Sequence, residues 1–251
     1  MSEGEEKESR GKDRLGVVIP VYNEEGALPV VLDSWLAALT ACGCEFVMHL
    51  YDDGSRDASA AILADYATKD SRVVVHHKAN TGHGMTVLQG YRENIGCFSW
   101  LLQIDSDDEM GPEEFKTLWA MRQNFDFLIG IRTGRRQTLS RKLVSWGAQL
   151  VVRTCFNGGI HDVNCPYRLL RCEAFAPLIA RMPATTYSPN LIISGWAMTV
   201  GLRCYQMPVR HWGRSTGEVS LRSWKLLTTT LLSIIQLAVF AVRHRTLVNE
   251  R

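Results

Sequence analysis

The sequence lacks a strong net charge, a zinc-type cysteine pattern and a signal peptide. Its 28 lysines and arginines nearly balance 26 aspartates and glutamates, and the formal net charge of +2 argues against a nucleic-acid-binding domain, which is usually far more basic. The seven cysteines are scattered, and the single close pair, Cys42 and Cys44, does not give zinc-type spacing. The odd number of cysteines and the missing signal peptide predict reduced thiols in the cytosol.

Length and composition are those of one folded domain with short additions at its ends. The chain has 251 residues, an ordinary length for a single α/β domain, and its 46% hydrophobic content can fill a core. Residues 1–14 show no apolar periodicity. We therefore expect a disordered tail over 1–14, a folded domain over 15–218 and a C-terminal element over 219–251.

Several short apolar runs end abruptly in acidic or polar residues. The clearest are residues 15–21 before Tyr22-Asn23-Glu24-Glu25, residues 45–51 before Asp52-Asp53-Gly54-Ser55, and residues 100–104 before Asp105-Ser106-Asp107. Each run reads as a buried strand and is followed by a helical pattern, which predicts an α/β fold with a mostly parallel sheet flanked by helices. The carboxyl ends of parallel strands meet at one edge, so these acids are expected to converge on one cleft.

Asp105 and Asp107 are the most informative of these acids. Two carboxylates one residue apart, with Asp108 and Glu109 beside them, repel each other unless a cation lies between them. Oxygen ligands of this kind suit Mg²⁺ or Mn²⁺ holding a diphosphate. Solvated acidic turns have the same pattern, and on this motif alone both interpretations stay open.

Four motifs taken in order resemble a family 2 glycosyltransferase of the Rossmann-like GT-A fold. They are Pro20-Val21-Tyr22-Asn23-Glu24, Asp52-Asp53-Gly54-Ser55, Asn80-Thr81-Gly82-His83-Gly84 and Asp105-Ser106-Asp107. The resemblance continues through residues 162–168 and ends near Arg214-Ser215-Thr216-Gly217, so that it covers roughly residues 15–220. Its second half is most similar to the branch that glycosylates polyprenyl or dolichyl phosphate.

The resemblance implies roles for specific residues. It assigns donor binding to six residues, namely Pro20, Tyr22, Glu24, Asp52, Asp53 and Gly84. It assigns the Mg²⁺ or Mn²⁺ site to Asp105, Asp107 and Glu109, with Asp107 also catalytic. Ser55 or Asp57 is expected to cap the following helix instead of binding ligand. His83 stands where the family usually has a lysine, and a plain helix start is the alternative interpretation of that position.

The acceptor side is poor in acids and rich in arginine. No carboxylate lies between Glu173 and Glu218, whereas many relatives that glycosylate hydroxyl groups carry a general base in this region. A phosphate monoester is already anionic and needs no base, so the sequence favours a lipid-phosphate acceptor. Arg132 and Arg214 match the phosphate-contacting arginines of the family and are our further catalytic candidates. The remaining arginines, including Arg168 and Arg210, are expected to face lipid headgroups or solvent.

Residues 226–242 form a run of 17 positions without a charged side chain, between Lys225 and Arg243. A membrane-spanning helix needs about 20 apolar residues, and three threonines, a serine and a glutamine weaken a span here. An amphipathic helix at the membrane surface is therefore favoured, with a spanning helix and a packed core or dimer contact as alternatives. We expect the protein at the cytoplasmic face of a membrane.

Together these features predict a metal-dependent, inverting transfer of a hexose from a nucleotide sugar to polyprenyl phosphate. A hydroxyl acceptor on a glycan or lipid is the close alternative, and a non-catalytic nucleotide-sugar-binding partner of a membrane complex is a more distant one. A metal-dependent nucleotidyltransferase would have a Gly-rich, basic loop after the first strand, which Pro20–Glu24 does not provide. The sequence leans toward UDP-sugars over GDP-mannose, and a homo-oligomer or a membrane subunit stays open.

Overall fold

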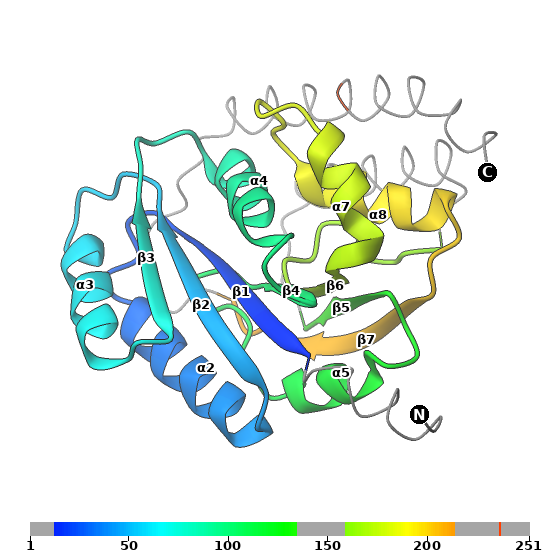
Figure 1. Ribbon diagram of the computed structural model, residues 1–251. Helices are drawn as coiled ribbons and strands as arrows, with labels where there is room; N and C mark the ends of the chain where they lie inside the picture. The colour runs from blue at the N-terminus through cyan, green and yellow to red at the C-terminus, as the bar shows by residue number, and fades with distance from the viewer. Residues whose placement is uncertain (1–12, 135–158, 214–235, 237–251) are drawn as a thin grey trace, which may run out of the picture.

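The computed structural model describes residues 13–134, 159–213 and 236, and within them the chain forms one seven-stranded sheet with helices on both faces (Figure 1). The strands are β1 (Arg14–Val21), β2 (Glu45–Asp52), β3 (Val73–His77), β4 (Trp100–Gln103), β5 (Phe127–Thr133), β6 (Arg168–Arg171) and β7 (Cys204–Arg210). The helices are α2 (Leu28–Cys42), α3 (Ser59–Lys69), α4 (His83–Asn94), α5 (Phe115–Met121), α7 (Cys172–Arg181) and α8 (Pro189–Thr199).

The sheet is mostly parallel and has one reversed strand. Its order is β3-β2-β1-β4-β6-β5-β7, and β6 runs antiparallel to both of its neighbours, β4 and β5. The other pairings, β1 with β2 and β4, β2 with β3, and β5 with β7, are all parallel. Because β6 is reversed, its first residue lies at the edge where β1, β2, β4 and β5 end. The loop before β6 is thereby brought to that edge.

Two helical layers cover the sheet. Helices α2, α3 and α5 form one layer, and α4, α7 and α8 form the other (Figure 1). The central strand β1 is buried along its whole length after Arg14, as its apolar, β-branched sequence predicts. Trp35 of α2 fixes the first layer, since its ring packs 5.9 Å from Phe115 of α5 and 5.4 Å from Tyr167.

The predicted α/β architecture is confirmed. Strands β1, β2 and β4 begin and end within one residue of the expected runs at 15–21, 45–51 and 100–104. Just before β5, the Asp126 carboxylate accepts hydrogen bonds from Arg171 and Arg203. Of the predicted disordered tail at 1–14, residues 1–12 lie outside the described residues, whereas Arg14 is the first residue of β1. Apart from Gln236, the predicted helix at 226–242 also lies outside the described residues, and the domain limits of 15–218 stay a prediction.

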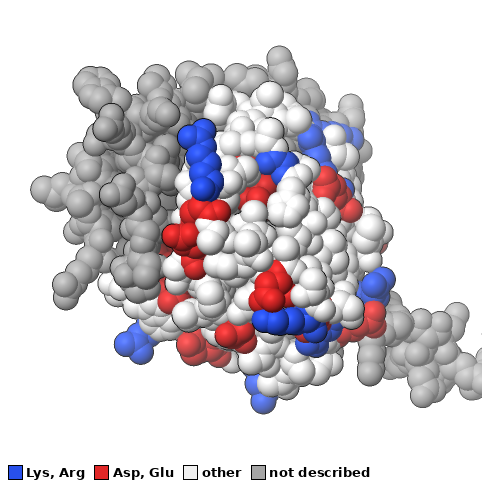
Figure 2. All heavy atoms as spheres, turned by 90° about the vertical axis from the view of Figure 1, so that its left-hand side faces the viewer, with Lys and Arg blue, Asp and Glu red and all other residues white. Residues whose placement is uncertain are grey.

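The surface agrees with the near-zero net charge. Figure 2, which faces the α3 and β3 side, shows basic and acidic side chains interspersed over the described residues, without a large patch of either sign. In the described part of the chain no helix has both the length and the apolar character needed to cross a membrane.

Candidate active site

The loops that follow β1 and β2 are joined by hydrogen bonds at the carboxyl edge of the sheet. The Asn23 backbone N–H donates to Ser55 Oγ at 3.1 Å, and Asn23 Oδ1 accepts from the Arg56 N–H at 2.8 Å. The Glu24 N–H donates to Ser59 Oγ at 2.9 Å. Asn23 has a φ of 54°, a left-handed conformation that asparagine tolerates better than most residues. This network places three predicted donor-binding residues at the end of β1, namely Pro20 and Glu24, which are buried, and Tyr22, which is half-buried.

Asp52 is a buried carboxylate with a partner on each oxygen. Its Oδ1 accepts the Ser55 N–H at 2.9 Å, and its Oδ2 lies 3.0 Å from Nδ1 of His77. Burial opposes ionisation, but the hydrogen bonds from Ser55 and His77 outweigh it and hold the pKa of Asp52 below its ordinary value. The side chain is therefore an ionised hydrogen-bond acceptor with a fixed orientation.

Asp53 binds the loop after β3 with both of its oxygens. Oδ1 accepts the Thr81 N–H and Oδ2 accepts the Gly82 N–H, each at 2.8 Å, and Oδ1 also pairs with the Lys78 ammonium. Lys78 in turn donates to Thr81 Oγ1 at 2.6 Å and to Thr86 Oγ1 at 3.1 Å. These contacts hold the segment that leads into α4. Donor binding by Asp53 stays a prediction.

Asp57 precedes Ala58, the N-cap residue of α3, and its carboxylate binds backbone N–H groups on both sides of this turn. Its Oδ1 accepts the Ser59 N–H at 3.0 Å in the first turn of α3, and its Oδ2 accepts the Glu25 N–H at 3.1 Å. Ser55 instead joins the first two loops.

Gly84 is needed for a close approach between two segments of the protein itself. A Cβ at this position would lie 1.8 Å from the Tyr187 carbonyl oxygen and 2.6 Å from its carbon. The family resemblance assigned Gly84 to donor binding, which stays a prediction. The described contact is with the loop before α8, so the glycine lets α4 pack against that loop.

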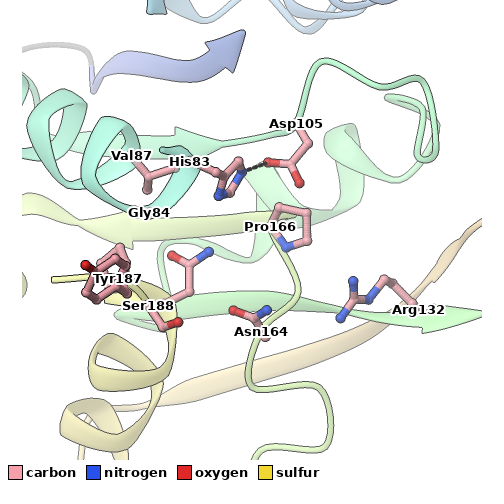
Figure 3. A pocket seen from close by; sticks show the side chains of 11 residues that line it. His83, Gly84, Val87, Asp105, Arg132, Asn164, Pro166, Tyr187 and Ser188 are labelled. Carbon is pink, nitrogen blue, oxygen red and sulfur yellow. Dashed lines mark hydrogen bonds and ion pairs between the residues drawn. The ribbon is translucent and has the colours of Figure 1, made fainter. Parts of the chain in front are cut away.

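Asp105 lies at the end of β4 and faces His83 at the start of α4. Its Oδ1 is 3.0 Å from His83 Nε2 (Figure 3). Gln103 Nε2 donates to the same oxygen at 3.4 Å. Burial opposes ionisation of Asp105, but the charge and hydrogen bond of His83 hold its pKa below the ordinary value. Partial desolvation disfavours the charged ring, but Asp105 outweighs it and raises the pKa of His83. His83, which stands where the family usually has a lysine, therefore contacts Asp105, a predicted metal ligand.

The other two predicted metal ligands follow in the same loop. The Glu109 N–H donates to Asp107 Oδ1 at 3.3 Å, whereas the Glu109 carboxylate lies 2.9 Å from Nε2 of the buried His211, beyond β7. The Trp212 indole donates to the Asp108 carbonyl at 2.9 Å and ties the loop to the same segment. Across the described ranges, no three His, Cys, Asp or Glu side chains gather closely enough to hold a metal by themselves.

The chemistry of this loop nevertheless fits a divalent cation. Mg²⁺ is usually bound by one or two carboxylates, and substrate phosphates and water complete its coordination. Asp105 and Asp107 would supply the two carboxylates, and the diphosphate of a donor would complete the ligand set.

Arg132 is held in place by the carboxylate of Asp162. Its Nε and Nη2 donate to the two carboxylate oxygens of Asp162, each at 2.7 Å, in a bidentate pair. Burial disfavours the guanidinium charge, but Asp162 outweighs it and raises the pKa of Arg132 above its already high ordinary value. Arg214, the other predicted phosphate-contacting arginine, lies outside the described residues.

A cavity of about 140 Å³ lies between these groups. Its walls come from the start of α4, the end of β4, the loop before β6 and the start of α8, and Figure 3 shows Asp105, Arg132 and Asn164 around it. The N-termini of α4 and α8 both contribute to the lining, and neither has a side-chain cap. Asn190, 5% exposed, also lines the cavity, and its Oδ1 has no hydrogen-bond partner among the described residues.

Arg168 is fully buried, and the expectation that it faces headgroups or solvent is wrong. Its guanidinium donates to the backbone carbonyls of Val163, Cys165 and Asn190. Burial lowers its pKa from the ordinary value. Arg168 therefore connects the loop before β6 to α8, the two segments that form one wall of the cavity.

Sequence reasoning missed the side chains that pair with the predicted site residues. They are His77 for Asp52, Lys78 for Asp53, Asp162 for Arg132 and His211 for Glu109. The signal that could have found the first two is the position of His77-Lys78 at the end of a strand next to the one that ends in Asp52-Asp53. The other two pairs join segments that no local pattern relates.

The mostly parallel sheet with one reversed strand and acids at its carboxyl edge is a GT-A-like α/β fold. The family model for glycosyl transferase family 2 matches residues 16–178, and the chain belongs to that family. It is therefore a glycosyltransferase.

The similar proteins are consistent with this assignment. An undecaprenyl-phosphate 4-deoxy-4-formamido-L-arabinose transferase from Pseudomonas paraeruginosa is 31% identical over 238 residues, which span 90% of this chain and 68% of that protein. The enzyme of the same name from Pectobacterium atrosepticum is 29% identical over 89% of this chain and 70% of its own length. The structure of glucosyl-3-phosphoglycerate synthase from Mycobacterium tuberculosis with Mn²⁺ and UDP-glucose aligns with a TM-score of 0.65 and 16% identity, over 94% of this chain and 82% of that one.

Proposed function

We propose that the protein transfers a sugar from a nucleotide sugar to a polyprenyl phosphate at a membrane surface, with Mg²⁺ or Mn²⁺ as cofactor and inversion at the anomeric carbon. The observation that carries this proposal is the cavity beside Asp105, which combines an arginine with two uncapped helix N-termini. The relatives from Pseudomonas and Pectobacterium, named as undecaprenyl-phosphate sugar transferases, support the same acceptor class.

The cavity suits a phosphate better than a hydroxyl group. Backbone N–H groups at a helix N-terminus and an arginine guanidinium are favourable partners of a phosphate. Asp105 is the single carboxylate among the described residues that line the cavity, and it is paired with His83. A hydroxyl nucleophile would need a free general base there, whereas a phosphate oxygen attacks as an anion. This supports a phosphorylated lipid over a plain alcohol.

The donor is proposed to bind along the ends of β1, β2 and β4. Asp52, with Tyr22 and Glu24 nearby in the adjoining loop, would accept hydrogen bonds from the nucleoside, and Asp105 and Asp107 would hold the cation. A divalent cation bound there would neutralise charge on the departing nucleoside diphosphate. The acceptor phosphate, held near Arg132, would attack the anomeric carbon from the side opposite the diphosphate, which inverts its configuration.

The membrane part of the proposal places the protein at the cytoplasmic face. It rests on the lipid character of the acceptor and on the predicted amphipathic segment at 226–242. The sugar and the base are left open between UDP- and GDP-linked donors.

The test is a transfer assay with membranes, polyprenyl phosphate and radiolabelled nucleotide sugars. The donor panel contains UDP- and GDP-hexoses and nucleotide-linked 4-deoxy-4-formamido-L-arabinose. We expect a labelled lipid that mild acid cleaves. Asp107→Asn should lower its formation at least about a hundredfold, because a bound cation contributes several kcal/mol. Asp108→Asn is the matched control, since asparagine tolerates the φ of 55° at that position, and it should retain activity.

Two results would contradict the proposal. One is a product formed equally well from unphosphorylated polyprenol, which would indicate a hydroxyl acceptor. The other is nucleotide-sugar binding without transfer to any lipid, which would indicate a binding role.

A further inference from the structure

Two adjacent residues at the end of β3 face two adjacent acids at the end of β2. His77 is the register partner of Asp52, and its ring contacts the Asp52 carboxylate. Lys78, the next residue, pairs with Asp53. The two pairs differ in their surroundings. The Lys78 and Asp53 side chains are 12% and 3% exposed and tie down a loop, whereas the His77 side chain is 55% exposed.

His77 therefore lies at the surface and contacts a carboxylate that is almost completely buried. The Asp52 side chain is 6% exposed, and the Ser55 backbone N–H on Oδ1 and the His77 ring on Oδ2 determine its direction. The Ser55 contact comes from the loop that follows Asp52 itself. The His77 contact is the one that fixes Asp52 from a neighbouring strand.

We infer that His77 is a positioning residue for the nucleoside end of the donor, acting through Asp52. The inference rests on the proposed function, because it requires that Asp52 accepts hydrogen bonds from a nucleoside. The carboxylate has four lone pairs, and the bonds from Ser55, through its N–H and hydroxyl, and from His77 leave at least one for a base N–H or a ribose O–H. Without His77, the carboxylate can rotate and must be reoriented when the nucleotide binds.

The chain provides a matched control in the preceding residue. His76 points away from Asp52, and its ring stacks on Tyr51 with centroids 4.3 Å apart and contacts His49 at 3.0 Å. His76→Ala therefore removes an imidazole from the same strand without touching Asp52.

The experiment measures nucleotide affinity of the full chain by calorimetry, with UDP and GDP titrated separately in the presence of Mg²⁺. For the nucleotide that the wild type binds, we expect His77→Ala to weaken binding about tenfold, as the loss of a hydrogen bond to a charged group predicts. His77→Asn should restore most of the affinity, because its amide N–H can replace the ring N–H. The donor KM should rise in His77→Ala while the acceptor KM and kcat stay near wild type. His76→Ala should bind as the wild type does.

Wild-type affinity in His77→Ala would overturn the inference alone, since donor binding itself would be intact. Equal weakening in His76→Ala and His77→Ala, with equal loss of thermal stability, would also overturn it, because the effect would then come from the strand as a whole. A wild-type protein that binds neither nucleotide would overturn the proposed function and the inference with it.

Discussion

Replacing Gly84 by alanine should destabilise the protein and damage the acceptor side while sparing the donor side. The added methyl group would lie 1.8 Å from the Tyr187 carbonyl oxygen. To reach the 3.4 Å of ordinary van der Waals contact, one of the two segments must move by about 1.6 Å. Backbone lies on both sides of the contact, so no flexible side chain can absorb this shift.

The size of the effect follows from two opposing terms. Overpacking a close contact costs about 1–3 kcal/mol, and a contact between two backbone segments belongs in the upper part of that range. Alanine offsets about 0.4–1 kcal/mol by restricting the unfolded chain. We therefore expect a net loss of about 1–2 kcal/mol in the free energy of unfolding. Because Tyr187 and Ser188 line the cavity, the shift should raise the acceptor KM about tenfold or more, as small misplacements in a binding site do.

Urea unfolding and steady-state kinetics measure the two consequences. Gly96→Ala is the control, since nothing lies within 4 Å of a Cβ at that position, and it should unfold as the wild type does or slightly later. A Gly84→Ala variant with wild-type unfolding free energy and wild-type acceptor KM would refute the reasoning. An increase in the donor KM alone would show that the glycine instead serves nucleotide binding.

Two further predictions concern ion pairs. Lys78→Met should lower the free energy of unfolding by about 3–5 kcal/mol, because it leaves the Asp53 carboxylate, 3% exposed, buried without its cation. The double variant with Asp53→Asn should recover part of that loss in urea unfolding, and a single variant as stable as the wild type would contradict the assignment. The hydrogen bond from Arg203 holds the pKa of Asp126 below its ordinary value. The pair should therefore stabilise the fold fully at pH values above the ordinary aspartate pKa of about 3.9. This stabilisation should be lost as the pH falls through the lower pKa of the folded state. The unfolding free energies of wild type and Arg203→Ala should therefore differ at neutral pH and converge in acid, and a constant difference would count against the pair.

Local sequence patterns were enough to predict the strands and the acids that follow them. Strands β1, β2 and β4 are set by local apolar runs, and their abrupt ends place Glu24, Asp52 and Asp105 at one edge of a parallel sheet. That result needs only the pattern of burial along each strand and the rule that parallel strands end together. The four motifs in order then indicated the family.

The partners of the charged site residues depend on contacts between segments that are distant in the sequence. Glu109 and His211 are 102 residues apart in sequence, and Arg132 and Asp162 are 30 apart, so no local periodicity links them. Gly84 shows the same limit, because its position in the sequence does not reveal its close approach to the Tyr187 carbonyl. Arg168 reads as a surface cation until the reversed strand β6 places it in the core, where three backbone carbonyls replace water around its charge. Pairing between distant segments depends on how the layers pack, and that is a property of the whole fold.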